Sequence, residues 1–408
     1  MRDYVEEIKS RVLARMDVSH DMSDKDIQTL IDESIAEKDI FRPSLKMREA
    51  AREQVFHALR GLDILQELIE DPQITEIMVN GHEHIFYEKE GRLFAWDRQF
   101  SSREKLEDTI QSIVAAGNRI VNEAVPIVDT RLGDGSRVNI VLAPVAVDGS
   151  VITIRKFPPH PMKMEDLLAR GSLSEEIAEL LKRLVQAGYN MFVSGGTGSG
   201  KTTFLNALSG YIPAGERVIT IEDSAELQLN EIPNLVRLEM RAANLENVAE
   251  ISIRRLIRTA LRMRPDRILV GECRGAEALD MLQAMNTGHD GSLSTGHANS
   301  CRDMLRRLET MVLMGMELPV SAIRGQIASG IDILIHLGRL RDRTRKVLDI
   351  MEIDGVCEGE IDLHPLYHFE ETGEQDGRII GEWRQPGRLK HTEKLFAAGL
   401  EQGYARLS

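Results

Sequence analysis

The chain has 408 residues, 42% hydrophobic and 28% charged, which is long enough for two or three soluble domains with apolar cores. Its formal net charge of −14 argues against DNA binding by the bulk surface, and an aromatic content of 4% argues against base-stacking platforms. No apolar run approaches the roughly 18 residues of a membrane span, and the N-terminus has no signal-peptide core. We therefore expect a cytoplasmic protein without direct membrane insertion.

Two regions are predicted before residue 158. Residues 1–61 are expected to be helical, because apolar residues recur at helical spacing, in one helix behind a Ser23–Asp26 capping pair. Residues 62–157 predict a smaller α+β domain, since alternating apolar runs surround one amphipathic segment. Its expected elements are strands at 74–80, 137–144 and 151–157, a hairpin at 84–97 that turns at Glu90–Gly91, and a helix at 103–120.

A hinge is predicted at 158–166, where three prolines within four positions favour extended backbone. It leads into a C-terminal domain at 167–408, in which strand-like and helix-like runs alternate, as in a parallel sheet with helices on both faces. The expected strands are 190–194, 217–221, 267–271 and 291–295, and the expected helices are 201–209, 252–263 and 276–286. After about residue 340 the sequence predicts short strands and turns.

A glycine-rich loop between a predicted strand and a predicted helix matches the spacing GxxxxGK[ST]. Glycines let consecutive backbone N–H groups converge on phosphate oxygens, and the helix N-terminus adds a favourable dipole. Lys201 is expected to reach the β- and γ-phosphates of ATP, and the Thr202 hydroxyl is expected to bind Mg²⁺. The residues predicted to bind the nucleotide are Gly195, Gly196, Thr197, Gly198, Ser199, Gly200, Lys201, Thr202 and Thr203.

Three further segments carry candidate side chains. The run RPDRILVGECRG at 264–275 places Glu272 at the end of a predicted strand, where a P-loop enzyme needs an acid for the Mg²⁺ shell. The run VITIEDSAELQL at 218–229 places three acids after another strand, namely Glu222, Asp223 and Glu226. The run TGHDGSLSTGHANS at 287–300 carries two histidines in a polar, glycine-rich frame, His289 and His297.

The order of these four segments resembles the secretion ATPase superfamily, the hexameric motors of type II secretion, type IV pili and type IV secretion. The segments correspond to its Walker A, Asp box, Walker B and His box. Longer stretches resemble the CpaF group of tight-adherence (Tad) pilus ATPases, at 131–149, 153–157, 261–300 and 307–314. The resemblance implies an α/β chain with a RecA-like P-loop NTPase C-terminal domain, a smaller α+β N-terminal domain and N-terminal helices. One departure is Gly296, where we expect a bulkier residue, and which should loosen the loop without removing His297.

The resemblance also implies roles for individual side chains. Glu226 is expected to activate the attacking water, Glu272 to hold water on Mg²⁺, and His297 to sense the γ-phosphate. Arg131 and Arg137 resemble the finger arginines of the N-terminal domain, which closes over the nucleotide. Secondary candidates are Glu222, Asp223, Arg155, Arg241 and His289. Ordinary roles stay open for all of these residues: acids at a helix start, a structural loop histidine, and surface arginines.

By this resemblance the chain is a homohexameric ATP hydrolase at the inner face of the cytoplasmic membrane. It would drive pilus assembly, retraction or secretion through an inner-membrane platform protein and, indirectly, pilin. The alternatives are a type IV secretion ATPase that moves DNA or protein, and a non-catalytic ATP-gated scaffold. The main support for DNA is a stripe of Arg254, Arg258 and Arg262. Given the acidic chain, we expect this stripe to be a solvated or inter-subunit face rather than a nucleic-acid site.

Overall fold

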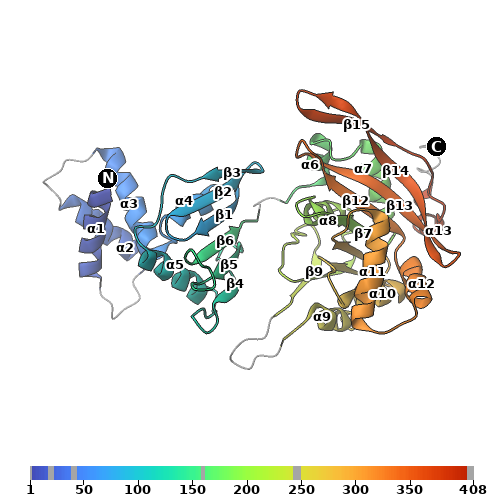
Figure 1. Cartoon of the computed structure of the whole chain (residues 1–408), viewed down its shortest axis with the longest axis horizontal. Coiled ribbons are helices and arrows are strands. Elements are labelled where there is room, and N and C mark those ends of the chain that lie inside the picture. The colour runs from blue at the N-terminus through green and yellow to red at the C-terminus, as the bar shows by residue number, and fades with distance from the viewer. Residues whose placement is uncertain (1, 17–22, 38–43, 158–160, 242–249, 402–408) are drawn as a thin grey trace. The chain divides into compact units, whose positions relative to one another are not determined.

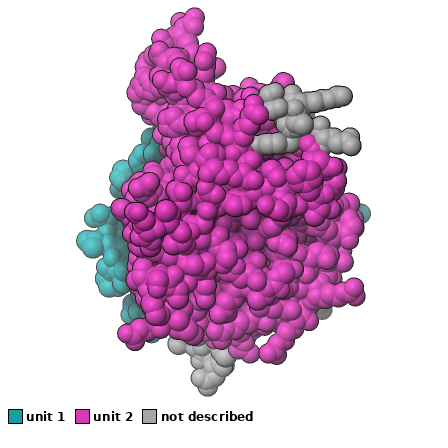
Figure 2. Space-filling model, turned by 90° about the vertical axis from the view of Figure 1, so that its right-hand side faces the viewer, with its two compact units in different colours: residues 1–159 teal, residues 160–408 magenta. Residues whose placement is uncertain are grey.

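The computed structural model describes residues 2–16, 23–37, 44–157, 161–241 and 250–401. The chain divides into two compact units, Met1–Pro159 (unit 1) and His160–Ser408 (unit 2), which Figure 2 shows in separate colours. Each unit has hydrophobic cores of its own. Within the described residues, no helix is long and apolar enough to cross a membrane.

Three helices begin unit 1: α1 (Arg2–Arg15), α2 (Asp24–Ala36) and α3 (Leu45–Arg60) (Figure 1). They pack on one another through a small separate core that includes Ile8, Ile27 and Val55. The predicted capping pair is present, because the Ser23 hydroxyl accepts from the backbone of Asp26 and the Asp26 carboxylate accepts from the backbone of Ser23.

The rest of unit 1 is an antiparallel sheet of order β3-β2-β1-β6-β5-β4 that shares a core with α5 (Arg103–Ala116) and with the short helix α4 (Leu65–Glu70). Its strands are β1 (Ile74–Asn80), β2 (His84–Lys89), β3 (Arg92–Ala95), β4 (Ile127–Arg131), β5 (Arg137–Val141) and β6 (Val151–Arg155). The predicted hairpin turn is confirmed, since Glu90 and Gly91 have φ of 53° and 73°. The helix α4 and the strand β4 escaped prediction.

Unit 2 is built on a nine-stranded sheet of order β15-β14-β13-β12-β7-β11-β10-β8-β9. The strands are β7 (Met191–Gly195), β8 (Arg217–Glu222), β9 (Asn234–Glu239), β10 (Arg267–Val270), β11 (Leu293–Gly296), β12 (Ile333–Arg339), β13 (Arg345–Cys357), β14 (Glu360–Gln375) and β15 (Arg378–Arg384). The six strands from β12 to β9 are parallel, whereas β13, β14 and β15 add antiparallel pairs at one side. The predicted parallel strands are therefore present.

Helices cover both faces of this sheet, as predicted (Figure 1). Met191 and Val193 of β7 share one core with α6 (Met164–Ala169), α7 (Glu175–Gln186) and α8 (Lys201–Ser209). Phe192 points to the opposite core, which contains α9 (Ile253–Ala260), α10 (Glu277–Asn286), α11 (Cys301–Gly315) and α12 (Val320–Gly330). A short helix, α13 (Glu393–Ala397), follows the last strand. Burial on both faces explains the apolar runs in the central strands.

Two expectations about unit 2 are wrong. The region after residue 340 forms long strands, 13 residues in β13 and 16 in β14, instead of short strands and turns. Register shifts within the β13–β14 pair interrupt the alternation of apolar and polar residues, which hides long strands in the sequence. The predicted extended backbone at 158–166 is also wrong for its last three positions, because α6 begins at Met164, while residues 158–160 lie outside the described residues.

Candidate nucleotide site

The P-loop connects β7 to α8, in the strand–loop–helix order that the motif requires. Gly198 and Gly200 have φ of 72° and 93°, a backbone conformation that favours glycine. A Cβ atom on Gly195 would lie 2.6 Å from the Leu337 carbonyl oxygen of β12, whereas one on Gly196 would meet nothing within 4 Å. The loop is thus tightly packed at its start and open beside Gly196, where phosphates need access.

Lys201 occupies the first turn of α8, and its ammonium group folds back over the loop. The Nζ atom donates to the carbonyl oxygens of Gly195 and Gly196, both at 3.0 Å, and lies 3.2 Å from Nδ1 of His297. Burial lowers the pKa of Lys201, while the charge of Glu272 raises it. A phosphate would replace these carbonyl partners with charged oxygens, which bind an ammonium group more strongly.

His297 and Glu272 meet beside Lys201, because β11 and β10 end next to each other at the same edge of the parallel sheet. Nε2 of His297 lies 2.7 Å from Oε1 of Glu272, a contact that is electrostatic rather than a well-directed hydrogen bond. Burial lowers the pKa of His297, and the nearby charges of Lys201 and Arg274 add to this effect against that of Glu272. The lowered pKa favours the neutral imidazole, whose Nδ1 atom can accept a hydrogen bond from Lys201.

Arg274 extends this set of contacts. Its Nη2 and Nε atoms donate to Oε2 of Glu272 at 2.6 and 2.9 Å, and its Nη1 atom lies 3.3 Å from Oδ2 of Asp223. Four charged or polar side chains thus follow one another from Lys201 through His297 and Glu272 to Arg274. Sequence reasoning missed Arg274, although it lies only two positions after Glu272.

The acidic segment after β8 contains no helix, since residues 223–232 form turns and irregular backbone. The open alternative of acids at a helix start is therefore excluded for Glu222, Asp223 and Glu226. Glu222, the last residue of β8, is buried, and burial raises its pKa to about 7 even though two backbone N–H groups donate to it. Glu226 lies in the loop that these two bonds hold.

Three of the predicted arginines form a row in unit 1. Arg131, Arg137 and Arg155 lie directly opposite one another on β4, β5 and β6, so their side chains share one face of the sheet. Glu76 of β1 lies directly opposite Arg155, so an acidic side chain adjoins this row. The sequence placed Arg155 second to the other two, whereas the strand register puts all three together.

The remaining secondary candidates lie elsewhere. His289 precedes β11 and contacts the Ala284 carbonyl at the end of α10, so it lies at the opposite end of β11 from His297. Arg241 pairs with Ile251 in an isolated bridge beyond the end of β9. The structure therefore does not bring His289 to the P-loop.

The expected loosening at Gly296 is wrong. Gly296 is buried at the end of β11, and a Cβ atom there would lie 2.9 Å from the Phe192 ring and 3.0 Å from Cε of Met304. Glycine at this position therefore allows close packing, and His297 follows a well-packed strand.

The predicted basic stripe is partly internal. Arg254 and Arg258 of α9 each place Nε 2.6 Å from a carboxylate oxygen of Asp280, which is only 2% exposed. These two arginines thus pair with Asp280 across α9 and α10, while the side chain of Arg258 stays 60% exposed. Arg262 is exposed as well, and the expectation of a solvated or inter-subunit face stays a prediction.

The loop also contacts the antiparallel side of the sheet. Nε of Arg345, the first residue of β13, donates to the Gly198 carbonyl at 2.8 Å. This residue lies 147 positions from Gly198, and no local motif pointed to it.

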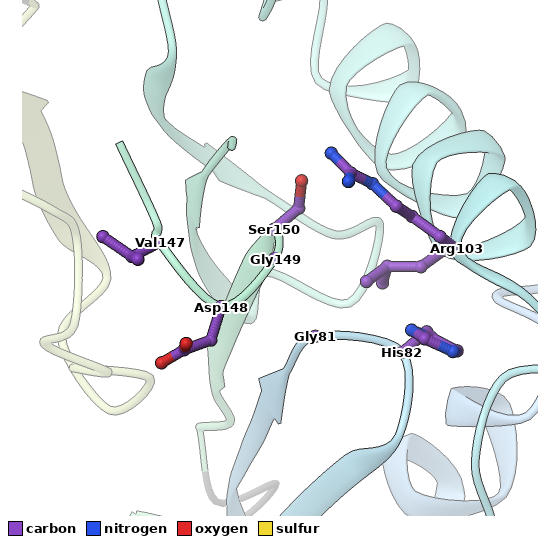
Figure 3. A pocket seen from close by; sticks show the side chains of 8 residues that line it. Gly81, His82, Arg103, Val147, Asp148, Gly149 and Ser150 are labelled. Carbon is purple, nitrogen blue, oxygen red and sulfur yellow. The ribbon is translucent and has the colours of Figure 1, made fainter. Parts of the chain in front are cut away.

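A separate pocket, of about 270 Å³, lies in unit 1 between the loop at Val147–Ser150 and the start of α5 (Figure 3). It contains no predicted site residue.

The residues of the P-loop fit a triphosphate and Mg²⁺. The Ser199 hydroxyl is buried and has no hydrogen-bond partner among the described residues, which is consistent with a ligand that supplies one. Within the same residues, no three His, Cys, Asp or Glu side chains converge to hold a metal ion. The parallel sheet, the P-loop and the acid Glu272 after a neighbouring strand are together typical of a RecA-like P-loop ATPase.

Comparison with known proteins agrees with this class. The profile described as Type II/IV secretion system protein matches residues 58–373. VirB11 of the type IV secretion system of Brucella suis is 35% identical over 320 residues, which cover 71% of this chain and 88% of VirB11. The solved structure of the ATPase DotB of Legionella pneumophila is 26% identical, with a TM-score of 0.50, and covers 70% of this chain and 78% of DotB. The pilus retraction motor PilT, solved with bound ADP, is similar in fold, with 18% identity, a TM-score of 0.52, and coverage of 85% of this chain and 88% of PilT.

The chain therefore belongs to the type II/IV secretion system protein family. The predicted RecA-like fold and the predicted class, an ATP hydrolase of secretion machinery, are confirmed. The roles of the individual site residues stay predictions.

Proposed function

We propose that this chain is a homohexameric ATPase motor of Tad-type pilus assembly, peripheral to the inner face of the cytoplasmic membrane. The observation that carries this proposal is the continuous set of contacts from Lys201 through His297 and Glu272 to Arg274 and Asp223. It links the phosphate-binding lysine to the acids on two other strand ends, so a change at the γ-phosphate can reach the whole edge of the sheet. The motifs at 131–149 and 261–300 support the Tad assignment.

In the proposed reaction, Glu226 accepts a proton from the water that attacks the γ-phosphorus, and ADP leaves with the bridging oxygen. Lys201 binds the β- and γ-phosphate oxygens after releasing the carbonyls of Gly195 and Gly196. Mg²⁺, held through Thr202 and water on Glu272, would neutralise charge on the phosphates. His297 contacts both Lys201 and Glu272, so loss of the γ-phosphate would change its surroundings.

Motion would come from unit 1. We assign Arg131 or Arg137 as the finger that neutralises charge in the transition state, an effect worth about 10³–10⁵ in rate in P-loop enzymes. Closure of this unit over the nucleotide and its release after hydrolysis would move an inner-membrane platform protein, which adds or withdraws pilin.

A second candidate is transport of protein or DNA by a type IV secretion system, and similarity to VirB11 favours it. The net charge of −14 and the engagement of Arg254 and Arg258 with Asp280 argue against DNA as a direct ligand. Turnover stimulated by single- or double-stranded DNA at physiological salt would favour this second candidate.

The central test compares Lys201→Ala and Glu226→Gln in the full chain. We expect Lys201→Ala to lose ATP binding, measured with a fluorescent ATP analogue, because the lysine charge is gone. Glu226→Gln should bind the analogue as tightly as the wild type but release phosphate about 10²–10⁴-fold more slowly. Normal phosphate release by Lys201→Ala would refute the nucleotide site, and full activity of Glu226→Gln would move the base to another residue. A membrane pull-down read for the platform protein and pilin then tests the partners.

A further inference from the structure

Glu222 ends β8 with a carboxyl group that points into the protein and is only 3% exposed. Its Oε2 atom accepts two backbone hydrogen bonds, from N–H of Glu226 at 2.8 Å and from N–H of Leu227 at 3.0 Å. Its Oε1 atom is buried without a hydrogen-bond partner among the described residues. One buried oxygen atom, Oε2 of Glu222, thus binds the backbone of Glu226, the proposed base, and of the residue after it.

The other side of this carboxyl group packs against the strand that carries Glu272. A Cβ atom on Gly271 would lie 2.8 Å from Cγ of Glu222, and N–H of Gly271 donates to the Ile221 carbonyl at 2.9 Å. Only a residue without a side chain allows this approach. Glu222 is therefore wedged between the loop of Glu226 and the residue directly before Glu272.

At Ala225 the loop has two contacts that are longer and more exposed, whereas further along it N–H of Gln228 donates to Oδ1 of Asn206 at 3.0 Å. Oε2 of Glu239 accepts from N–H of Ala225 at 3.4 Å, and Arg237 donates to the Ala225 carbonyl at 3.4 Å. Hydrogen bonds of this length contribute less than those of 2.8–3.0 Å, and exposure to water weakens them further. Glu239 lies directly opposite Glu222 in the pairing of β8 with β9, so it offers a matched carboxylate at the same level.

We propose that Glu222 is a positioning residue for ATP hydrolysis, whose buried carboxyl group fixes the backbone of Glu226 against the strand end that carries Glu272. Glu222 itself contacts neither the attacking water nor the phosphate. It acts by fixing the position of the proposed base, Glu226. This inference rests on the proposed role of Glu226. A misplacement of about 1 Å at a catalytic group can cost about 10²-fold in rate, and two buried hydrogen bonds at successive backbone positions prevent such a shift.

The test measures steady-state ATP hydrolysis and binding of an ATP analogue for Glu222→Ala and Glu222→Gln, with Glu239→Gln as the matched control. We expect Glu222→Ala to lower kcat about 10–100-fold while KM and analogue affinity change less than about twofold. Glu222→Gln keeps an oxygen acceptor and should restore most of kcat. Glu239→Gln should keep wild-type kinetics. A kcat of Glu222→Ala within twofold of wild type overturns the proposal, as does an equal loss with Gln and Ala.

A double-mutant cycle with Gly271→Ala separates positioning from general damage. In the wild-type background, the new Cβ atom would displace Glu222, and kcat should fall as in Glu222→Ala. In the Glu222→Ala background, the nearest remaining atom is Cβ of residue 222 at 3.5 Å, so Gly271→Ala should cost little more. Additive losses overturn the proposal.

Thermal unfolding of each variant shows whether the fold is retained, and Glu226→Gln separates the two levels of inference. An inactive Glu226→Gln beside a fully active Glu222→Ala overturns the positioning role alone. A fully active Glu226→Gln instead refutes the assignment of the base on which that role depends.

Discussion

The buried carboxyl group of Glu222 makes the stability of unit 2 depend on pH. Its pKa is raised to about 7 by burial, from an ordinary value of 4.5. Between pH 6 and pH 8 the unfolded chain keeps this group ionised, whereas the folded chain binds a proton at pH 6 and loses it by pH 8. Because the folded state holds more protons in this window, raising the pH lowers the free energy of unfolding. The substitution Glu222→Gln removes this titration.

The size of the effect follows from the pKa. The folded carboxyl group is roughly 90% protonated at pH 6 and roughly 10% at pH 8, and integration over this range corresponds to about one pKa unit, or about 1.4 kcal/mol. We therefore expect Glu222→Gln to gain about 1.4 kcal/mol relative to wild type when the pH rises from 6 to 8. Any constant cost of the substitution cancels in this difference.

Urea denaturation at the two pH values measures it. The chain has two tryptophans, and Trp383 reports on unit 2, where its indole N–H donates to the Val347 carbonyl at 2.8 Å. A Trp96→Phe background leaves only this signal. Both pH values lie above the sequence pI of about 5.4, which keeps the chain negatively charged and soluble.

The control is Glu239→Gln, which removes an exposed carboxylate at the paired position. It measures what the loss of a carboxylate elsewhere on the sheet contributes to the same comparison. If the difference between Glu222→Gln and wild type is independent of pH, Glu222 does not titrate in this window and the reasoning about its burial is refuted.

Two further predictions concern the arginine row and the packing behind His297. Arg137→Ala should lower kcat about 10³-fold or more while leaving ATP-analogue affinity within twofold, because a finger arginine stabilises charge that develops only in the transition state. Unchanged steady-state kinetics would exclude Arg137 as the finger. Gly296→Ala should lower the free energy of unfolding by about 1–3 kcal/mol, since its methyl group would lie 2.9 Å from the Phe192 ring. An unfolding midpoint equal to that of wild type would show that the surrounding side chains yield without cost.

Short-range patterns were enough to predict much of the nucleotide site. The P-loop spacing needs only eight consecutive residues, and its strand–loop–helix context is visible because β7 begins with an apolar run and α8 follows the loop. Glu272, two residues after the end of β10, could be predicted in the same way. These features depend on neighbours in the chain, so the sequence contains them in full.

The long antiparallel strands and β9 escaped prediction because their pattern is irregular or exposed. Register shifts interrupt β13 and β14, and the edge strand β9 buries little of its surface. The prediction for Gly296 was wrong for a different reason. In a sequence, a glycine suggests a flexible backbone, whereas here the Phe192 and Met304 side chains pack so closely on Gly296 that a Cβ atom would clash with them.

The sequence by itself determined the class of the protein, because phosphate binding and the acidic strand ends are local motifs with fixed spacing. Only the tertiary structure decided which of those residues act together. Strand order and register bring together residues that are distant in the chain. They place Arg345 at the carbonyl group of Gly198, and they align Arg131, Arg137 and Arg155 in one row. The hydrogen bonds from Arg274 to Glu272 likewise form beside the P-loop only in the folded chain. Glu222 was one acid among three in the sequence. Burial against Gly271 and the two N–H groups of its own loop set it apart, because desolvation and hydrogen bonding act through space rather than along the chain.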